Sequence, residues 1–143
     1  GMVLQWVIGS SSADDSTTSN TYVNTSLTAS ITPTNASNII QIYVFGSDET
    51  TSGAGTKNPT SEYSIRRTTD TPTTIGGDVT VGYVDVENGD SSYAPLFLLA
   101  SETAANTNVH TYTLRFRDVG GSNTVVFKGA TCPGRMLLLE LTP

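Results

Sequence analysis

The sequence is short of the residues that most often carry chemistry. Its 143 residues include one cysteine, Cys132, and one histidine, His110. A lone cysteine excludes an internal disulfide and any cysteine-based metal cluster. A lone histidine removes the usual sites in which two histidines share a metal ion. We therefore expect no metal or organic cofactor, and we expect that the protein is not an enzyme.

Basic residues and long apolar runs are also scarce. Seven Lys and Arg stand against 13 Asp and Glu, which gives a formal net charge of -6. A nucleic-acid surface needs clustered Lys and Arg, so this balance argues against a nucleic-acid partner. The longest apolar runs, at 42–45, 96–100 and 137–139, are far shorter than the roughly 20 residues that cross a bilayer. We expect no membrane insertion.

The first residues suggest a soluble chain. Gly1 before Met2 resembles the remnant of a tag, so we take the natural chain to begin at Met2. No basic stretch followed by an apolar one comes after Met2, and we expect no signal peptide.

Hydroxyl-bearing and turn-forming residues are abundant instead. The chain has 24 Thr, 16 Ser and 13 Gly. Threonine is β-branched and suits a half-exposed strand, whereas it is a poor helix former. Apolar and polar residues alternate with period two, for example where Leu27, Ala29 and Ile31 are separated by Ser and Thr. The alternation predicts eight or nine strands, at 3–8, 26–32, 38–46, 61–68, 79–86, 94–101, 109–117, 123–128 and 135–141.

Turn signals separate these strands and define the fold class. Pro33, Asn88-Gly89 and the paired glycines at 76–77 and 120–121 punctuate the chain. Many short strands at such spacings predict an all-β, jelly-roll-like antiparallel β-sandwich. No shift in composition marks a second domain, so we expect one domain over residues 2–143. Residues 9–20, rich in Ser and Thr, are expected to form a loop or mobile arm.

Two arrangements invite a catalytic or metal-binding interpretation. The acidic segment 85–90 resembles a calcium loop, but an EF-hand counted from Asp85 would place Asp90 at the glycine position and Leu96 at the final glutamate position. We favour an acidic hairpin there and leave a looser calcium site open. His110 could join a Ser-His-Asp triad, but the chain has no Gly-x-Ser-x-Gly motif. We favour a partly buried histidine near the end of a strand, because His110 shares strand parity with Tyr112, Leu114 and Phe116.

Arginines and tyrosines offer possible ligand contacts. Arg115 and Arg117 lie two apart on one strand, and Arg66 and Arg67 lie on another. They could bind an anion such as a sialic-acid-like group. Alternatively, they could form a solvated outer face, or pair across strands or between subunits with some of the 13 acidic residues, and this is the interpretation that we favour. The six tyrosines could stack on sugar rings, although packing is the commoner role.

Three predicted strands are apolar at both parities, at 39–45, 96–99 and 137–141. A sandwich strand with one solvent face should alternate, so these strands need a second cover besides the sandwich core. A neighbouring subunit could supply it. We expect a homo-oligomer, with a trimer as the best single prediction.

Two polar segments, 47–60 and 71–78, are predicted to be loops. Loops on a rigid β scaffold are common places for recognition, and short polar side chains suit sugar hydroxyls. The candidate surface-recognition residues are Thr50, Thr51, Thr56, Lys57, Asn58, Thr73, Thr74 and Asp78.

Several stretches together resemble a known family. They are Thr21-Tyr-Val-Asn-Thr-Ser-Leu-Thr-Ala-Ser-Ile-Thr-Pro-Thr-Asn-Ala-Ser-Asn-Ile-Ile, Ile65-Arg-Arg, Pro95-Leu-Phe-Leu-Leu-Ala, His110-Thr-Tyr-Thr-Leu-Arg-Phe-Arg and Met136-Leu-Leu-Leu-Glu-Leu. The sequence resembles a domain found in phage tail-fibre and other virion structural proteins, especially of marine phages, over about 120 residues from Thr21 to Leu141. The family often has Arg-Gly-Ser or Arg-Gly-Thr where this chain has Arg66-Arg67-Thr-Thr, and a Leu-Asp-x-Pro turn where it has Leu99-Ala-Ser-Glu-Thr.

The resemblance implies a jelly-roll head domain of a kind that commonly assembles as trimers. It implies a structural or host-attachment component of a phage particle, either a tail fibre or a head-decoration module. The expected partners are copies of the chain, other virion proteins and a host-surface glycan. The alternative is a carbohydrate-binding β-sandwich module of a secreted bacterial protein.

Overall fold

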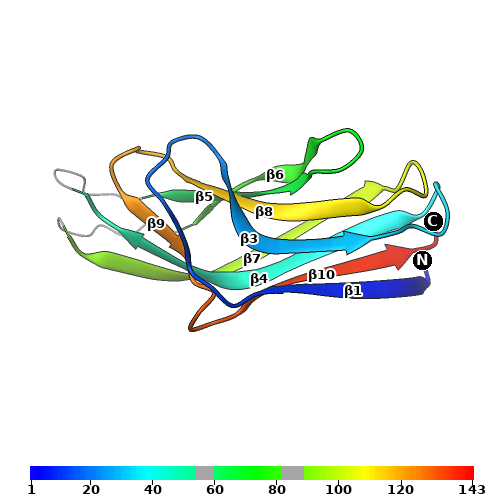
Figure 1. Cartoon of the computed structure of the whole chain (residues 1–143), viewed down its shortest axis with the longest axis horizontal. Helices are drawn as coiled ribbons and strands as arrows, with labels where there is room; N and C mark the ends of the chain where they lie inside the picture. Colours follow the sequence, from blue (N-terminus) through cyan, green and yellow to red (C-terminus); the bar gives the residue numbers. More distant parts are fainter. Residues whose placement is uncertain (54–59, 82–88) are drawn as a thin grey trace.

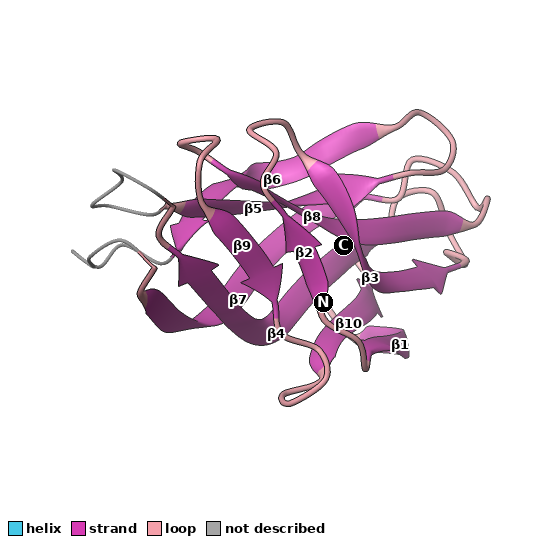
Figure 2. Ribbon diagram, turned by 60° about the vertical axis from the view of Figure 1, so that its left-hand side comes forward, coloured by secondary structure: helices cyan, strands magenta, loops and turns pink. Residues whose placement is uncertain are grey.

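The computed structural model describes residues 1–53, 60–81 and 89–143, and every regular element in these ranges is a strand. Figures 1 and 2 show two layers of strands facing each other. No helix in the described ranges is long and apolar enough to cross a membrane. The ten strands are β1 (Val3–Ser11), β2 (Asp15–Thr17), β3 (Val23–Ile31), β4 (Ile39–Thr51), β5 (Ser61–Arg67), β6 (Thr73–Val81), β7 (Ser91–Thr103), β8 (His110–Asp118), β9 (Thr124–Phe127) and β10 (Gly134–Leu141).

The order of the strands identifies the fold. One sheet runs β1-β10-β4-β7, with β9 and β2 continuing beside the far half of β4, and the other runs β3-β8-β5-β6. Every pairing is antiparallel. Apart from the short β2 and β9, these eight strands are interleaved between the two sheets as in a jelly roll of two Greek keys. The predicted all-β, jelly-roll-like sandwich is therefore confirmed, with ten strands in place of eight or nine.

The core lies between the inner faces of the two sheets. Buried side chains from both sheets form one apolar cluster that includes Ile42, Leu98, Leu114 and Leu138. The Tyr63 ring stacks on Phe116 with centroids 5.9 Å apart. The alternation that predicted the strands is thus the alternation between this core and the two outer faces.

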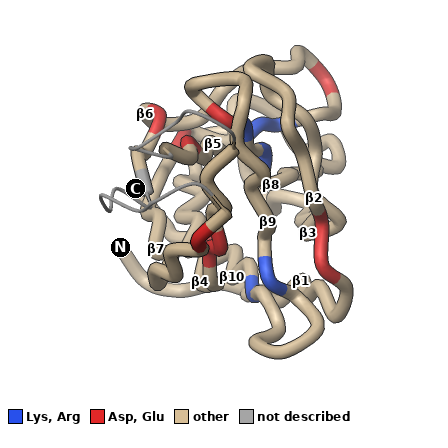
Figure 3. Tube along the Cα trace, turned by 90° about the vertical axis from the view of Figure 1, so that its left-hand side faces the viewer, with Lys and Arg blue, Asp and Glu red and all other residues tan. Residues whose placement is uncertain are grey.

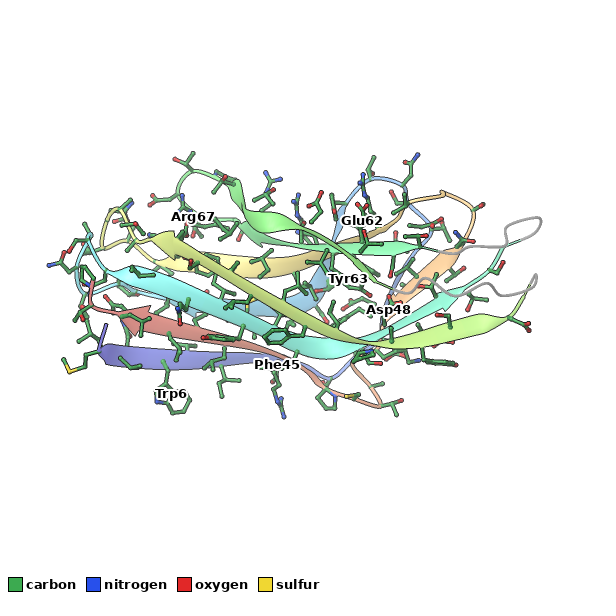
Figure 4. All side chains as sticks on the ribbon, turned by 180° about the vertical axis from the view of Figure 1, so that it is seen from behind. Trp6, Phe45, Asp48, Glu62, Tyr63 and Arg67 are labelled. Atoms are coloured by element: carbon green, nitrogen blue, oxygen red, sulfur yellow. The ribbon has the colours of Figure 1, made fainter. Side chains whose placement is uncertain are left out.

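Polar residues close the core at one end. The Tyr63 hydroxyl donates a 2.7 Å hydrogen bond to Asp48, and Thr50 donates a second to the same carboxylate. Both Asp48 and Thr50 are fully buried, and burial raises the pKa of Asp48. Figure 4 shows Tyr63 and Asp48 between the two sheets. Asp48 and Thr50 thus take the inward positions that apolar residues occupy earlier in β4, and the strand continues to Thr51.

Glu140 closes the other end of the core. Its buried carboxylate accepts hydrogen bonds from the side chains of Gln5 and Asn38, and from both the backbone N–H and the hydroxyl of Thr34. Burial alone would raise the pKa of Glu140, but these hydrogen bonds outweigh it and lower the pKa to about 2. The carboxylate thereby ties β1, β10 and the turn after β3 together.

Several predicted boundaries are wrong. Residues 9–20 are not a loop throughout, because β1 continues to Ser11 and β2 lies within the segment. The first five residues of the predicted loop at 47–60 belong to β4, and β7 starts at Ser91 and not at residue 94. The paired glycines at 76–77 lie inside β6, which begins at Thr73 and not at residue 79, whereas the predicted strand positions 82–86 lie outside the described residues. Gly76 has φ +75°, and the pairing with β5 shifts its register nearby, so these glycines form a bulge and not a turn.

A close aromatic contact marks the point where β4 changes partner. β4 pairs with β10 up to Phe45 and with β9 from Asp48 onward. Between them, the buried Phe127 ring packs on the backbone of Gly46, where an added Cβ would lie 2.5 Å from a ring carbon. The same ring contacts Gly134 at the start of β10.

We predict that Gly46→Ala destabilises the protein by about 1–3 kcal/mol, because Phe127 is enclosed and cannot move away from the new methyl group. The matched control is Gly77→Ala, since an added Cβ at Gly77 meets nothing within 4 Å. Thermal unfolding of both variants is the measurement. Equal melting temperatures for the two variants would contradict this packing.

We predict that Glu140→Gln destabilises the protein at neutral pH and that the effect fades in acid. The folded pKa of Glu140, about 2, lies below its ordinary value of 4.5. Its stabilisation, on the order of 2–3 kcal/mol, is therefore complete above about pH 5 and is lost as the pH falls toward 2. Chemical denaturation of both proteins at pH 7 and pH 3 measures this. The same difference in unfolding free energy at both pH values would rule out the ionised carboxylate as the cause.

Candidate functional site

The outer face of the β1-β10-β4-β7 sheet is apolar. We define this apolar face by eight side chains: Trp6, Ile8, Tyr43, Phe45, Phe97, Leu99, Leu137 and Leu139. Trp6 is 63% exposed, Leu99 57% and Phe97 55%. Figure 4 shows Trp6 on the outer side of this sheet, with its side chain directed away from the core.

Strand register places these side chains next to one another. Ile8, Leu137, Tyr43 and Leu99 are successive cross-strand partners and form one row over four strands. On one side of this row Trp6 pairs with Leu139, and on the other Phe45 pairs with Phe97, their ring centroids 5.3 Å apart. The strands β4, β7 and β10 have apolar residues at their outward as well as their inward positions, and the outward ones form a continuous patch.

The patch is about as large as the largest apolar patch of a typical monomeric protein. Its five exposed members, Trp6, Ile8, Phe45, Phe97 and Leu99, together present on the order of 500 Å². A typical monomeric protein has a largest apolar patch of roughly 300–600 Å², and such patches are often functional. The patch therefore reaches the size at which an interaction surface is expected.

Polar groups lie at the edges of the apolar face. Beyond Phe45, Lys128 bridges Glu49 at 3.2 Å and Asp14 at 2.6 Å. Two adjoining shallow clefts, of about 260 and 300 Å³, open there between Tyr93 and the exposed Cys132. The strand register defines the described outward positions that lie between Trp6 and Phe97. Arg135 is the one charged residue among them. A neutral centre with charges at its edge is the usual composition of a protein interface.

The opposite outer face, on the β3-β8-β5-β6 sheet, has the contrary character. Its outward side chains are hydroxyls and charged groups, which pair across strands as Ser30 with Thr111 and Thr28 with Thr113. Glu62 binds Arg117 through both Nε and a terminal nitrogen. Figure 3 shows basic positions beside β8 and, separately, near β9 and β10. We call this surface the polar face.

The arginines of β5 and β8 do not all lie on the same face of their sheet. Arg67 points inward and pairs with Glu102 at 2.9 Å, and Arg117 pairs with Glu62. Arg66 and Arg115 lie on the polar face without an acidic partner among the described residues. The predicted pairing of these arginines with acidic residues is thus confirmed for two of the four.

His110 lies in a buried polar network. Nδ1 is 3.3 Å from the Tyr112 hydroxyl, and Nε2 is 3.2 Å from the side-chain oxygen of Asn106. The Tyr112 hydroxyl donates a 2.6 Å hydrogen bond to Glu102. No serine hydroxyl in the described residues hydrogen-bonds to the imidazole, which is fully buried at the start of β8. His110 thus lies at a strand end and faces inward, as strand parity predicted, but it is fully buried and not partly buried.

The acidic segment 85–90 lies outside the described residues except for Gly89 and Asp90. Within the described ranges no three His, Cys, Asp or Glu side chains are grouped so that they could hold a metal ion.

The predicted recognition residues are dispersed. Thr50 and Thr51 are in β4, and Thr50 is buried, so the prediction that it lies on a surface loop is wrong. The cause is the buried Asp48, which makes a polar residue favourable at the inward position of Thr50. Thr73, Thr74 and Asp78 are exposed but belong to β6. Thr56, Lys57 and Asn58 lie outside the described residues.

Compared by sequence, the chain matches no protein-family model and no curated protein. Among solved structures it is similar to three of infectious bursal disease virus. They are the Gx strain (12% identity, TM-score 0.41), the Gt strain (14%, 0.38) and the VP2 subviral particle (14%, 0.43). The matches cover 97%, 97% and 99% of this chain but only 37%, 38% and 38% of those chains. The jelly roll is identified by the strand order of this chain and not by these likenesses, whose TM-scores are below 0.5.

Proposed function

We propose that this chain is a structural module of a virus particle, which acts by assembling with copies of itself through the apolar face. The observation that carries the proposal is the continuous row Ile8–Leu137–Tyr43–Leu99, flanked by Trp6 and the Phe45–Phe97 pair. A second copy that covers this face would remove those side chains from water and so stabilise the assembly.

The polar face provides an internal comparison. It shows how this chain builds a sheet surface that stays in water, with Ser, Thr and charged residues at the outward positions of β3, β5 and β8. The same chain places aromatic and aliphatic residues at the outward positions of β1, β4, β7 and β10. The difference between two faces of one sandwich supports an interface on the apolar one.

Charge also favours association through this face. Copies with a net charge of -6 repel one another at long range. The apolar face brings together few charges, and Lys128 pairs with both of the acids nearest to it, Glu49 and Asp14, and so offsets part of their charge. Contact through this face therefore adds little electrostatic cost to the burial of apolar surface.

We further propose that the module performs no catalysis. The one histidine is engaged by Tyr112 and Asn106 inside the fold. The buried carboxylates of Asp48 and Glu140 are likewise occupied by hydrogen bonds that close the core. These contacts support a structural role for the groups that an enzyme would otherwise use.

The particle type is the finer part of the proposal. The resemblance of residues 21–141 to phage tail-fibre and virion domains supports a phage, a trimer and a role in host attachment. A carbohydrate-binding module of a secreted bacterial protein is the alternative, and the neighbouring genes distinguish the two. Tail, baseplate or capsid genes beside this one are expected.

We predict that the protein is an oligomer at micromolar concentration and that Leu99→Asp makes it a monomer. A buried aspartate in the central row would leave a charge without a partner in the interface. Val109→Asp is the matched control, since Val109 is 51% exposed but precedes β8, away from the apolar face. Light scattering measures the mass, and circular dichroism checks that both variants fold.

For wild type and the Val109→Asp variant we expect a multiple of 15.1 kDa, with three copies the expected number. A wild-type monomer would refute assembly through the apolar face. An oligomer that survives Leu99→Asp would place the interface elsewhere on the molecule.

A further inference from the structure

Two arginines on the polar face lack the partner that an acidic protein could readily supply. The chain has 13 acidic and seven basic residues. Arg67, Arg117 and Lys128 are each paired with carboxylates, whereas neither Arg66 nor Arg115 forms an ion pair with a described residue. Their isolation in a chain with excess acid is the starting point for a binding site.

Strand register brings the two cations together. β5 and β8 are neighbours, and Arg66 pairs with Thr113 while Arg115 pairs with Ser64, two residues before Arg66. The two arginines are therefore diagonal neighbours on one face, a distance that long side chains can span. Burial and the nearby charge of Arg66 both lower the pKa of Arg115. An anion between the two would relieve this repulsion.

The Arg115 guanidinium is held in place. One terminal nitrogen donates hydrogen bonds to Ser64 at 3.1 Å and to Thr74 at 2.9 Å. The Tyr22 ring lies 4.8 Å from the guanidinium carbon. Both acceptors are neutral hydroxyls, and Nε is buried without an acceptor among the described residues. The group is thus positioned in advance, and it forms no ion pair with a described residue, although the nearby Asp78 offsets part of its charge.

The surroundings indicate which kind of anion fits. Arg66 lies in a row with the buried Thr113 and with the exposed Thr28 and Thr74, and the two exposed hydroxyls suit the hydroxyl groups of a sugar. Beyond Arg115 the surface becomes acidic, because Glu62 and Asp78 both lie near Tyr22. A polymer with closely spaced charges, such as a nucleic acid, would meet these carboxylates. A ligand with one isolated anionic group would not.

We propose that the polar face binds an acidic glycan, with one carboxylate or sulfate group between Arg66 and Arg115 and with neighbouring sugar hydroxyls on Thr28 and Thr74. This deepens the attachment part of the proposed function, because it names the ligand class and the surface. It places recognition on a sheet face, away from the end loops that the sequence analysis favoured.

Titration of the oligomeric protein with 3′-sialyllactose, 3′-sulfolactose and lactose, followed by NMR, tests the site. The first two distinguish a carboxylate from a sulfate, and lactose is the neutral control. We expect one or both acidic sugars to bind and lactose to bind at least tenfold more weakly, since one charged hydrogen-bonding pair contributes about tenfold or more in affinity.

Arg66→Gln is the decisive variant, because Arg66 holds no partner in the described structure whose loss would unfold the protein. Arg135→Gln is the matched control, because it removes the same charge from the opposite sheet. Arg135 lies on the apolar face, which the oligomer would cover, so the two substitutions are compared in the folded, monomeric Leu99→Asp variant. We expect Arg66→Gln to weaken the binding of the acidic sugar at least tenfold. Arg135→Gln should change it less than about twofold, because distant exposed charges are screened.

Three results would overturn the inference. The first is that neither acidic sugar binds at ten times the dissociation constant of about 1 mM that is expected for a single sugar. The second is that the two substitutions weaken binding equally. The third is that a short oligothymidylate competes for the site as well as the acidic sugar does. The monomeric Leu99→Asp variant separates this inference from assembly. If it still binds the sugar, the site stands whatever the fate of the apolar interface, whereas loss of binding there would show that the Arg66–Arg115 site alone is insufficient.

Discussion

The pairing of β4 with β7 organises this molecule. The two strands are paired from Ile39 with Thr103 to Thr51 with Ser91, over the whole length of both. Along its other edge β4 holds β10 and then β9. One long central strand thereby fixes the register of the entire first sheet. The inward residues of that sheet meet the core, and its outward residues align as the apolar face.

The same constraint explains the aromatic contact at Gly46. Along one edge, β4 pairs first with β10 and then with β9. A gap is left between them, because β10 begins and β9 ends beside this part of β4. Phe127 fills this gap from the end of β9, and both Gly46 and the first residue of β10, Gly134, lack the side chain that would exclude it. Packing at the switch point therefore maintains the alignment on which both faces of the sheet depend.

Much of the fold could be predicted from hydrophobic alternation, because the sandwich core repeats it. β3 and β8 alternate as expected, and the strands apolar at both parities lie where the sheet has an apolar outer face. The end of β4 could not be predicted in this way. Its inward residues there are Asp48 and Thr50, which satisfy each other and Tyr63 inside the core. A buried polar pair has the same sequence pattern as a loop.

The candidate sites were less accessible to sequence analysis. Arg66 and Arg67 are adjacent in the chain, yet one lies on the polar face and the other reaches Glu102 inside. The two side chains differ only because adjacent residues of a strand point to opposite faces. The acidic residue that pairs with Arg67 comes from the other sheet. β2 was missed for a related reason: its Asp-Ser-Thr sequence carries no apolar signal, and only pairing with β9 makes it a strand.

The separation of the two outer faces has a consequence for how the proposed functions combine. A sandwich directs its outer faces in opposite directions, so an assembly that covers the apolar face leaves the polar face of every copy open. Each copy would then present one Arg66–Arg115 pair on the outside of the assembly. Single-sugar contacts on an open sheet are weak, but several copies that engage one glycan-covered surface raise the overall affinity by roughly 10²–10⁴ without any new contact. Assembly through one sheet would thus make a weak site on the other sheet sufficient for attachment.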